Sequence, residues 1–191
     1  MAYRKKIKVR LQPGIYDEFP EDDLHAILRG ADELIFTGGR TLLSKLLKGS
    51  KDKHLLSQEL DDCPVYGYFS DRTLKDIQAR VDWVMDRGYL TYDYDGHLPL
   101  LVHTERGWEM VKELRINEFL SHFDIQLMSE EAPYDMFYLK DRNEEMIFQF
   151  LDRVEEMKDT RYLVLLEDWR KIESKNVRQR IEAVLAAWSE E

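Results

Sequence analysis

Apolar residues recur at helical spacing along the first half of the chain. The pattern predicts helices over residues 21–30, 40–48 and 73–88. In the third of these, Thr73 and Asp76 make a capping-box-like start, and Gly88 stands where a left-handed C-terminal cap would lie. Gly49 is placed to end the second helix in the same way.

Alternating polar and apolar residues predict strands around these helices. Residues 6–11 indicate a short strand that ends at Pro13-Gly14. Residues 89–94 and 98–103 predict two further strands, which are joined at Asp95-Gly96, a dipeptide typical of tight hairpins. Helices together with one hairpin indicate a mostly helical α+β fold.

From Thr104 to the end of the chain the pattern is helical. Helices are predicted over 141–158 and 162–169, and Ser174 caps a last helix that we expect to pack on those two. A boundary loop is expected around Pro133. These changes of pattern divide the chain into an N-terminal arm, strand and helix over 1–30, a mixed segment over 31–114 and a helical region over 115–191.

The composition is that of a folded protein with unevenly distributed charge. Hydrophobic residues make up 43% of the chain and charged residues 35%, and the formal net charge is −10. This charge excludes a generally basic protein that coats nucleic acid. The balance is +3 over residues 1–53 and −7 over residues 115–191, so a polyanion is expected to dock on the N-terminal region.

The cysteine content and the hydropathy pattern bear on compartment and metal sites. Cys63 is the one cysteine, so an internal disulfide and a multi-cysteine zinc site are excluded, and a reducing cytoplasm fits best. No run approaches the roughly 20 apolar residues that span a bilayer. No signal-peptide stretch follows the basic start. We expect a soluble cytoplasmic protein with no membrane contact, metal or cofactor.

Three helices, a two-stranded hairpin and a closing helix follow one another in the order of a winged helix. Four segments narrow this interpretation: GRTLLSKLLKGS (39–50), PVYGY (64–68), RGYL (87–90) and LPLLVHTERG (98–107). In this order they resemble the RQC domain, the winged helix that follows the motor of RecQ-type DNA helicases. The resemblance covers residues 31–114 and implies DNA as the partner.

Two parts of those helicases have no counterpart in this sequence. There is no GxxxxGK[ST] phosphate loop, and Cys63 cannot form the four-cysteine zinc module that precedes the domain in the helicases. The resemblance therefore implies a non-enzymatic DNA-binding protein. The last helices resemble a HEAT-type helical hairpin, so the expected architecture is a winged helix followed by a HEAT-like hairpin, through which a protein partner could also bind.

The resemblance implies contacts with the DNA backbone just after the second helix. The matching positions are Lys48, Ser50, Lys53 and His54. Lys51 lies among them, and lysines around the break at Gly49 suit phosphate binding in their own right. Exposed backbone amides at this break are also expected to bind phosphates. The alternative is a solvated basic helix end.

A second loop and the wing complete the implied site. Ser70 stands where the family has a basic residue, and Arg72 follows two positions later as a substitute. Tyr94, beside the turn, matches the aromatic residue that stacks on the end of a duplex and helps to part its strands. The alternative is a wing that Asp93 and Asp95 repel from DNA.

The remaining aromatic, acidic and histidine residues are expected to have structural roles and not catalytic ones. No catalytic constellation is expected, and Tyr66 and Tyr68 are expected to pack in the fold. The helix over 73–88 is close to neutral and offers Lys75 and Gln78 to a groove, so we expect no sequence-specific reading of bases. Two hypotheses follow: a DNA-binding protein that favours forks and duplex ends, or an adaptor whose winged helix and acidic helical tail bind proteins.

Overall fold

The computed structural model of the protein describes residues 9–129 and 132–189. The chain divides after Val111 into two compact units, which are described separately. The three regions predicted from the sequence, 1–30, 31–114 and 115–191, have different limits from these two units, and that division stays a prediction.

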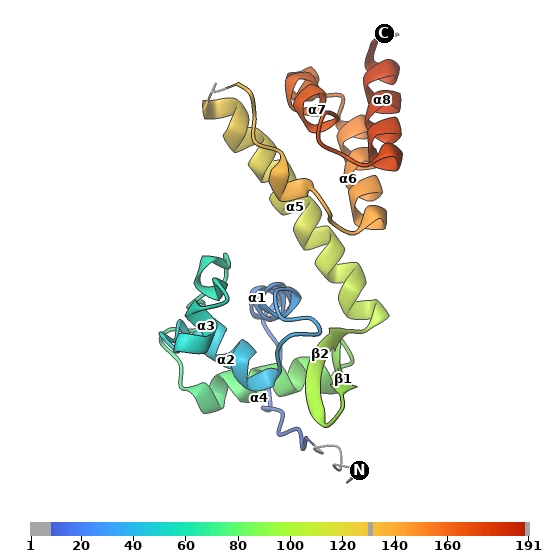
Figure 1. Cartoon of the computed structure of the whole chain (residues 1–191). Helices are drawn as coiled ribbons and strands as arrows, with labels where there is room; N and C mark the ends of the chain where they lie inside the picture. Colours follow the sequence, from blue (N-terminus) through green and yellow to red (C-terminus); the bar gives the residue numbers. More distant parts are fainter. Residues whose placement is uncertain (1–8, 130–131, 190–191) are drawn as a thin grey trace. The chain divides into compact units, whose positions relative to one another are not determined.

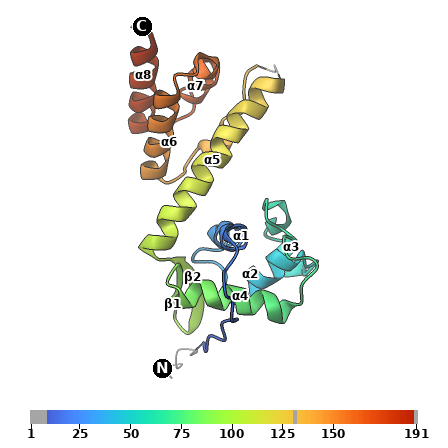
Figure 2. The ribbon, with the colours of Figure 1, turned by 180° about the vertical axis from the view of Figure 1, so that it is seen from behind.

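Three helices form the body of the N-terminal unit (Figures 1 and 2). They are α1 (Glu21–Asp32), α2 (Arg40–Lys48) and α4 (Leu74–Asp86). Each buries an apolar face against the other two, and fully buried leucine, isoleucine and valine side chains fill the space between them. The predicted ends are confirmed: Gly49 and Gly88 both have φ near 73°, and Thr73 accepts a hydrogen bond from the Asp76 amide.

The predicted hairpin is confirmed, with a shifted turn. β1 (Leu90–Asp95) pairs antiparallel with β2 (Leu98–His103). Asp95 pairs with Leu98, so the loop consists of Gly96 and His97 and not of the predicted Asp95-Gly96. The positive φ of Gly96, 60°, suits the first position of a two-residue turn. Helices followed by this two-stranded wing make the unit a winged helix of the α+β class.

The strand predicted over residues 6–11 is wrong where the structure describes it. Residues 6–8 lie outside the described residues, and residues 9–11 are irregular. Backbone amides farther along this arm bond to α4: Gln12 donates to the Asp82 carboxylate (2.7 Å) and Gly14 to the Ala79 carbonyl oxygen (3.1 Å). The alternation over 6–11 predicted a strand without specifying a partner strand, and among the described residues the hairpin β1–β2 is the sheet.

Two short helices lie between α2 and α4 where the sequence predicted none. These are α3 (Lys53–Leu56) and the 3-10 turn η1 (Leu60–Asp62). Asp52 caps α3 through a hydrogen bond from the His54 amide (3.0 Å). A single helical turn has too few residues for an apolar period, so the sequence pattern could not reveal it.

The C-terminal unit is helical. Its elements are most of α5 (Glu105–Ser129), η2 (Phe137–Leu139), α6 (Glu144–Met157), η3 (Thr160–Tyr162), α7 (Leu163–Trp169) and α8 (Lys175–Ser189). As predicted, α8 packs on α6 and α7. Phe123, Phe150, Tyr162 and Trp169 meet edge-on or tilted in the centre of the unit. Among the described residues, no helix is both long and apolar enough to cross a membrane.

Candidate nucleic-acid interface

The sequence assigns DNA contact to two loops: the first follows α2 and contains Ser50, Lys51 and Lys53, and the second covers residues 66–73. The two loops are joined through the C-terminal end of α2. The amide of Gly67 donates to the carbonyl oxygen of Leu46 (3.0 Å), and the amide of Phe69 donates to that of Leu47 (2.8 Å). These carbonyls are among those that an α-helix leaves unbonded at its end. The second loop therefore closes the end of α2, and the two loops form one surface.

Two glycines allow this close approach. Gly49 and Gly67 have φ of 73° and 74°, and a Cβ on Gly49 would lie 3.0 Å from the Gly67 Cα. Both the backbone conformation and the contact favour residues without a side chain. Tyr66 adds a hydrogen bond from its hydroxyl group to the Ser50 carbonyl oxygen (3.1 Å). Tyr66 thus packs as expected, whereas Tyr68 is 44% exposed.

Lys48 bridges the two loops. Its ammonium group donates to the carbonyl oxygens of Ser70 and of Arg72, the latter at 2.7 Å. Two of its three N–H donors are therefore used within the protein. Lys48 therefore serves first to hold the second loop against the end of α2.

Three backbone amides at the α2 break already donate within the protein and so are not open to phosphates. Gly49 donates to Leu46, Ser50 donates to Lys45, and His54 donates to the Asp52 cap. The helix end is closed by its own left-handed glycine cap, which consumes the donors that an open loop would offer. Basic side chains are the other candidate phosphate contacts of this loop.

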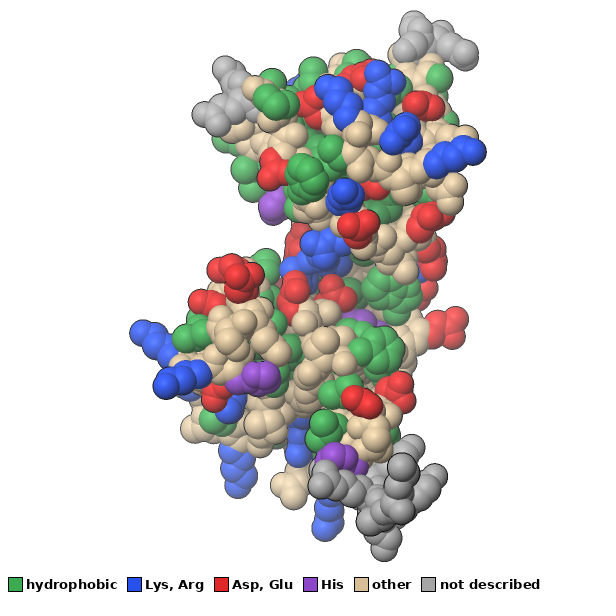
Figure 3. All heavy atoms as spheres, viewed as in Figure 1, with side chains coloured by type: hydrophobic (Ala, Val, Ile, Leu, Met, Phe, Trp, Pro, Cys, Tyr) green, Lys and Arg blue, Asp and Glu red, His purple; other side chains and the backbone are tan. Residues whose placement is uncertain are grey.

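Lys51 and Lys53 are the candidate phosphate-binding side chains of the first loop. Both are exposed, and neither pairs with a carboxylate within the part of the chain that the structure describes. His54, also exposed, follows them at the start of α3. Lys and Arg side chains protrude from the edge of the unit formed by α2 and α3 (Figure 3). This edge is the part of the predicted site with unneutralised positive charge.

The other basic residues near this edge are paired. Lys45 donates to Asp52 (2.7 Å), and this bond holds the pKa of the Asp52 carboxyl group below its usual value. Arg72, 40% exposed, lies 3.5 Å from Asp76. Ser70 is exposed and brings no charge. The second loop therefore contributes less positive charge than the first.

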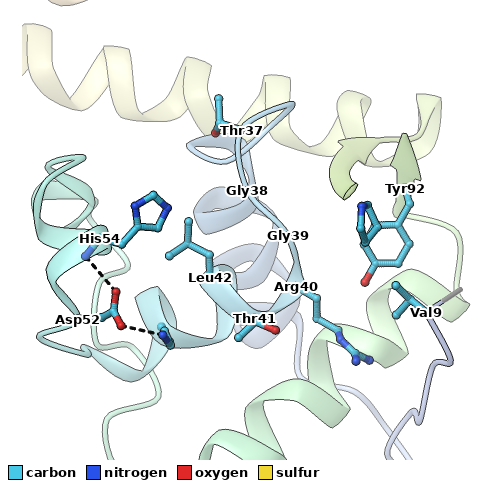
Figure 4. Close-up of a pocket in the computed structure, with 12 residues that line it drawn as sticks. Val9, Thr37, Gly38, Gly39, Arg40, Thr41, Leu42, Asp52, His54 and Tyr92 are labelled. Carbon is cyan, nitrogen blue, oxygen red and sulfur yellow. Dashed lines mark hydrogen bonds and ion pairs between the residues drawn. The ribbon is translucent and has the colours of Figure 1, made fainter. Parts of the chain in front are cut away.

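A groove of about 550 Å³ crosses the N-terminal end of α2 (Figure 4). Asp52 and His54 line it on the side of α3, and Tyr92 and Pro99 line it on the side of the wing. Arg40 lies between them, at the first turn of α2. The groove connects the basic edge with the wing. The sequence analysis missed it, because its walls come from segments far apart in the chain.

The wing separates its aromatic and acidic side chains onto opposite faces. Side chains alternate along a strand, so Tyr94 shares a face with Tyr92, which lines the groove, while Asp93 and Asp95 occupy the other face. Tyr94 pairs across the hairpin with Pro99 and is half-buried. Burial raises the pKa of Tyr92 to about 12, so its hydroxyl group stays protonated at neutral pH.

The N-terminal arm covers α4, the helix that corresponds to a recognition helix. Phe19 stacks on Trp83 with ring centroids 4.0 Å apart, and the amides of Gln12 and Gly14 bond to the same helix. Arg80 binds Asp23 of α1 at 2.6 Å. A helix covered in this way has little surface left to insert into a DNA groove.

No group of three His, Cys, Asp or Glu side chains in residues 9–129 and 132–189 could hold a metal ion. The exposed lysines of the basic edge suit binding of a polyanion.

Comparison with known families agrees with this geometry. A family model described as the RQC domain matches residues 22–119, just over half of the chain. No curated protein and no solved structure matches. The matched segment contains both joined loops, the whole wing and every residue that lines the groove except Val9.

Proposed function

The chain belongs to the RQC domain family, and on that premise we propose that it is a non-enzymatic DNA-binding protein that recognises duplex ends, forks or junctions and not a base sequence. RQC domains serve nucleic-acid binding in RecQ helicases, which supports the partner. The observation that carries the proposal is the basic edge, where Lys51 and Lys53 extend from a loop that Lys48 and two glycines hold in place. Cations on a rigid loop position a backbone without reading bases.

The covered α4 supports binding without sequence preference. A winged helix that reads sequence needs a free helix face carrying hydrogen-bonding side chains. Here the arm lies over that helix, and Arg87 stacks on Trp83, with its guanidinium carbon 5.3 Å from the ring centroid. Lys75 and Gln78 alone fall short of the paired contacts that specify a base.

The basic edge leads to a prediction about salt dependence. If Lys51 and Lys53 each neutralise one phosphate, their replacement by alanine flattens the slope of log K against log salt by about 1.8. The slope is measured by fluorescence anisotropy with labelled duplex DNA. Lys48→Ala is the comparison, and we expect it to weaken binding mainly by releasing the second loop. A slope that is unchanged in the Lys51→Ala/Lys53→Ala variant would contradict this site.

The wing leads to a prediction about DNA ends. If the ring of Tyr94 stacks on a terminal or fork base pair, Tyr94→Ala weakens binding to blunt or forked duplexes by about 1–3 kcal/mol. Binding to a closed circle, which has no exposed base face, changes little. The two affinities are compared at one salt concentration. Equal losses on both substrates, or none on either, would mean that the wing is not a base platform.

An acidic pair on the other face of the wing provides the matched control. Asp93→Asn/Asp95→Asn removes negative charge and leaves Tyr94 in place, so we expect tighter binding with the same preference for ends. If this variant instead binds no better than the wild type, the wing lies outside the electrostatic reach of the DNA.

An adaptor function is the second candidate, and one observation favours it. Ile125 and Met128 on α5 are 62% and 83% exposed, and Met128 lines a groove with Asp124 and Arg161. Exposed apolar side chains beside a groove are typical of protein-binding surfaces. Failure of the wild type to shift any DNA structure at low salt, together with specific capture of one protein, would favour the adaptor.

A further inference from the structure

We propose that the start of α8, just after the turn that follows α7, is a second contact with the DNA backbone, in which Lys175 and Arg178 each neutralise one phosphate. This inference rests on the proposed function and extends it to the acidic C-terminal unit. Lys and Arg side chains gather on this unit over α7 and α8 (Figure 3). Cations of a DNA-binding protein that have no carboxylate partner are available to phosphates.

Most cations elsewhere in the C-terminal unit are neutralised by carboxylates. Arg153 pairs with Glu113 at 3.1 Å, Arg161 with Asp159, and Arg180 with Asp152 at 2.6 Å. These pairs explain how a unit that is acidic overall can hold many basic residues without offering them to an anion. In the turn between α7 and α8, Arg170 and Lys171 are paired in the same way with Glu167 and Asp168. Lys175 and Arg178, at the start of α8, have no carboxylate partner among the described residues.

Arg178 is held by backbone oxygens. Its guanidinium group donates to the carbonyl oxygens of Arg170 (3.1 Å) and Glu173 (2.9 Å), which fixes the group over the turn. Carbonyl oxygens carry no net charge, so the positive charge of Arg178 is not cancelled. Its side chain remains exposed. A fixed, exposed cation binds an anion with little further loss of side-chain freedom.

Lys175 lies one helical turn before Arg178, on the same side of α8. Its side chain is exposed and has no hydrogen-bond or ion-pair partner within the described chain. Residues three apart on a helix are neighbours, so the two charges form one patch. Glu173, the carboxylate nearest in sequence, is buried and accepts from Trp169 Nε1 (2.9 Å) and from the Ser174 amide (3.1 Å).

The form of the patch favours a nucleic-acid backbone over a membrane. The patch is small and lies on a unit with a net negative charge, which a broad anionic bilayer would repel. The large hydrophobic side chains exposed in this unit lie outside residues 170–178, so the turn has no apolar anchor for a bilayer. A strand of phosphates can touch two cations without facing the whole unit.

The test is the salt dependence of binding to duplex DNA by the full chain. We expect Lys175→Ala/Arg178→Ala to flatten the slope of log K against log salt by about 1.8, which makes the affinity lost between 50 and 200 mM salt about tenfold smaller. Because Arg178 also holds the turn, Lys175→Ala is measured alone, with an expected change of about 0.9. The matched control is Arg153→Ala/Arg161→Ala, which removes two cations already paired with carboxylates.

Three outcomes would overturn the inference. One is an unchanged slope in both Lys175 variants while Lys51→Ala/Lys53→Ala flattens it, which leaves the proposed function intact. The second is an equal change in the Arg153→Ala/Arg161→Ala control, which shows a general effect of charge. The third is loss of binding to phosphatidylserine vesicles with no change on DNA. Absence of any DNA binding by the wild type instead refutes the proposed function itself.

Discussion

An Arg80→Ala variant is expected to lose about 3–5 kcal/mol of the stability of the N-terminal unit, because it leaves the buried carboxylate of Asp23 without its partner. The guanidinium group of Arg80 lies 2.6 Å from that carboxylate, and the two side chains are 9% and 12% exposed. The pair joins α4 to α1 and lies against Tyr16 and Phe69, whose rings are 5.0 and 5.5 Å from the guanidinium carbon.

The loss is measured by hydrogen exchange at the amides of α4, which reports on this unit separately from the other. Arg72→Ala is the matched control: Arg72 is 40% exposed and 3.5 Å from Asp76, so it should cost less than about 1 kcal/mol. A double replacement, Asp23→Leu/Arg80→Met, removes both charges and should recover much of the stability. An Arg80→Ala variant as stable as the Arg72→Ala control would show that the pair contributes little.

The second large effect is expected at Gly107, in the first turn of α5. A Cβ built on this residue would lie 2.0 Å from the carbonyl oxygen of Tyr89, at the base of the wing. That oxygen already accepts hydrogen bonds from the amide and the hydroxyl group of Thr104. Gly107→Ala must therefore push helix and wing apart, at an expected cost of about 3 kcal/mol.

Gly88 is the control that separates this steric clash from the backbone strain of replacing a glycine. Gly88→Ala places a Cβ with nothing within 4 Å, but at φ of 73°, so its cost of about 1–2 kcal/mol is strain of the backbone alone. The stability of the wing in both variants is measured by hydrogen exchange at the amides of β1 and β2. If the wing amides of the Gly107→Ala variant are as protected as those of the wild type, the start of α5 is free to shift, and the close approach to Tyr89 is not required.

Hydrogen bonds between segments far apart in the sequence hold the parts of the winged helix together. The wing is tied to α5 through Gly107 and Thr104, and β2 exchanges two hydrogen bonds with the loop between α1 and α2 through Leu101. Lys48 fixes the second contact loop on the first. Groups held in place before binding lose little freedom when DNA arrives.

The sequence by itself determined the elements whose signals are local. Periodicity predicted α1, α2 and α4, Thr73 predicted a helix start, and Gly49 predicted a helix end; the structure confirms all of these. Each follows from neighbours within one or two turns of chain, where a cap or a glycine has the same meaning in any fold. Four motifs in order were also enough to identify the family, which the match over residues 22–119 confirms.

Tertiary structure decided which of the predicted contact groups keep hydrogen-bond donors that the protein itself does not use. No local pattern shows that Lys48 is used by carbonyls 22 and 24 residues away, or that the Gly49 and Ser50 amides are occupied. Residues just beyond the predicted strand bond to α4 through the amides of Gln12 and Gly14, which no local pattern shows. Hydrogen-bonding groups take whichever partners the packed chain brings close, and that choice is made between segments far apart in the sequence.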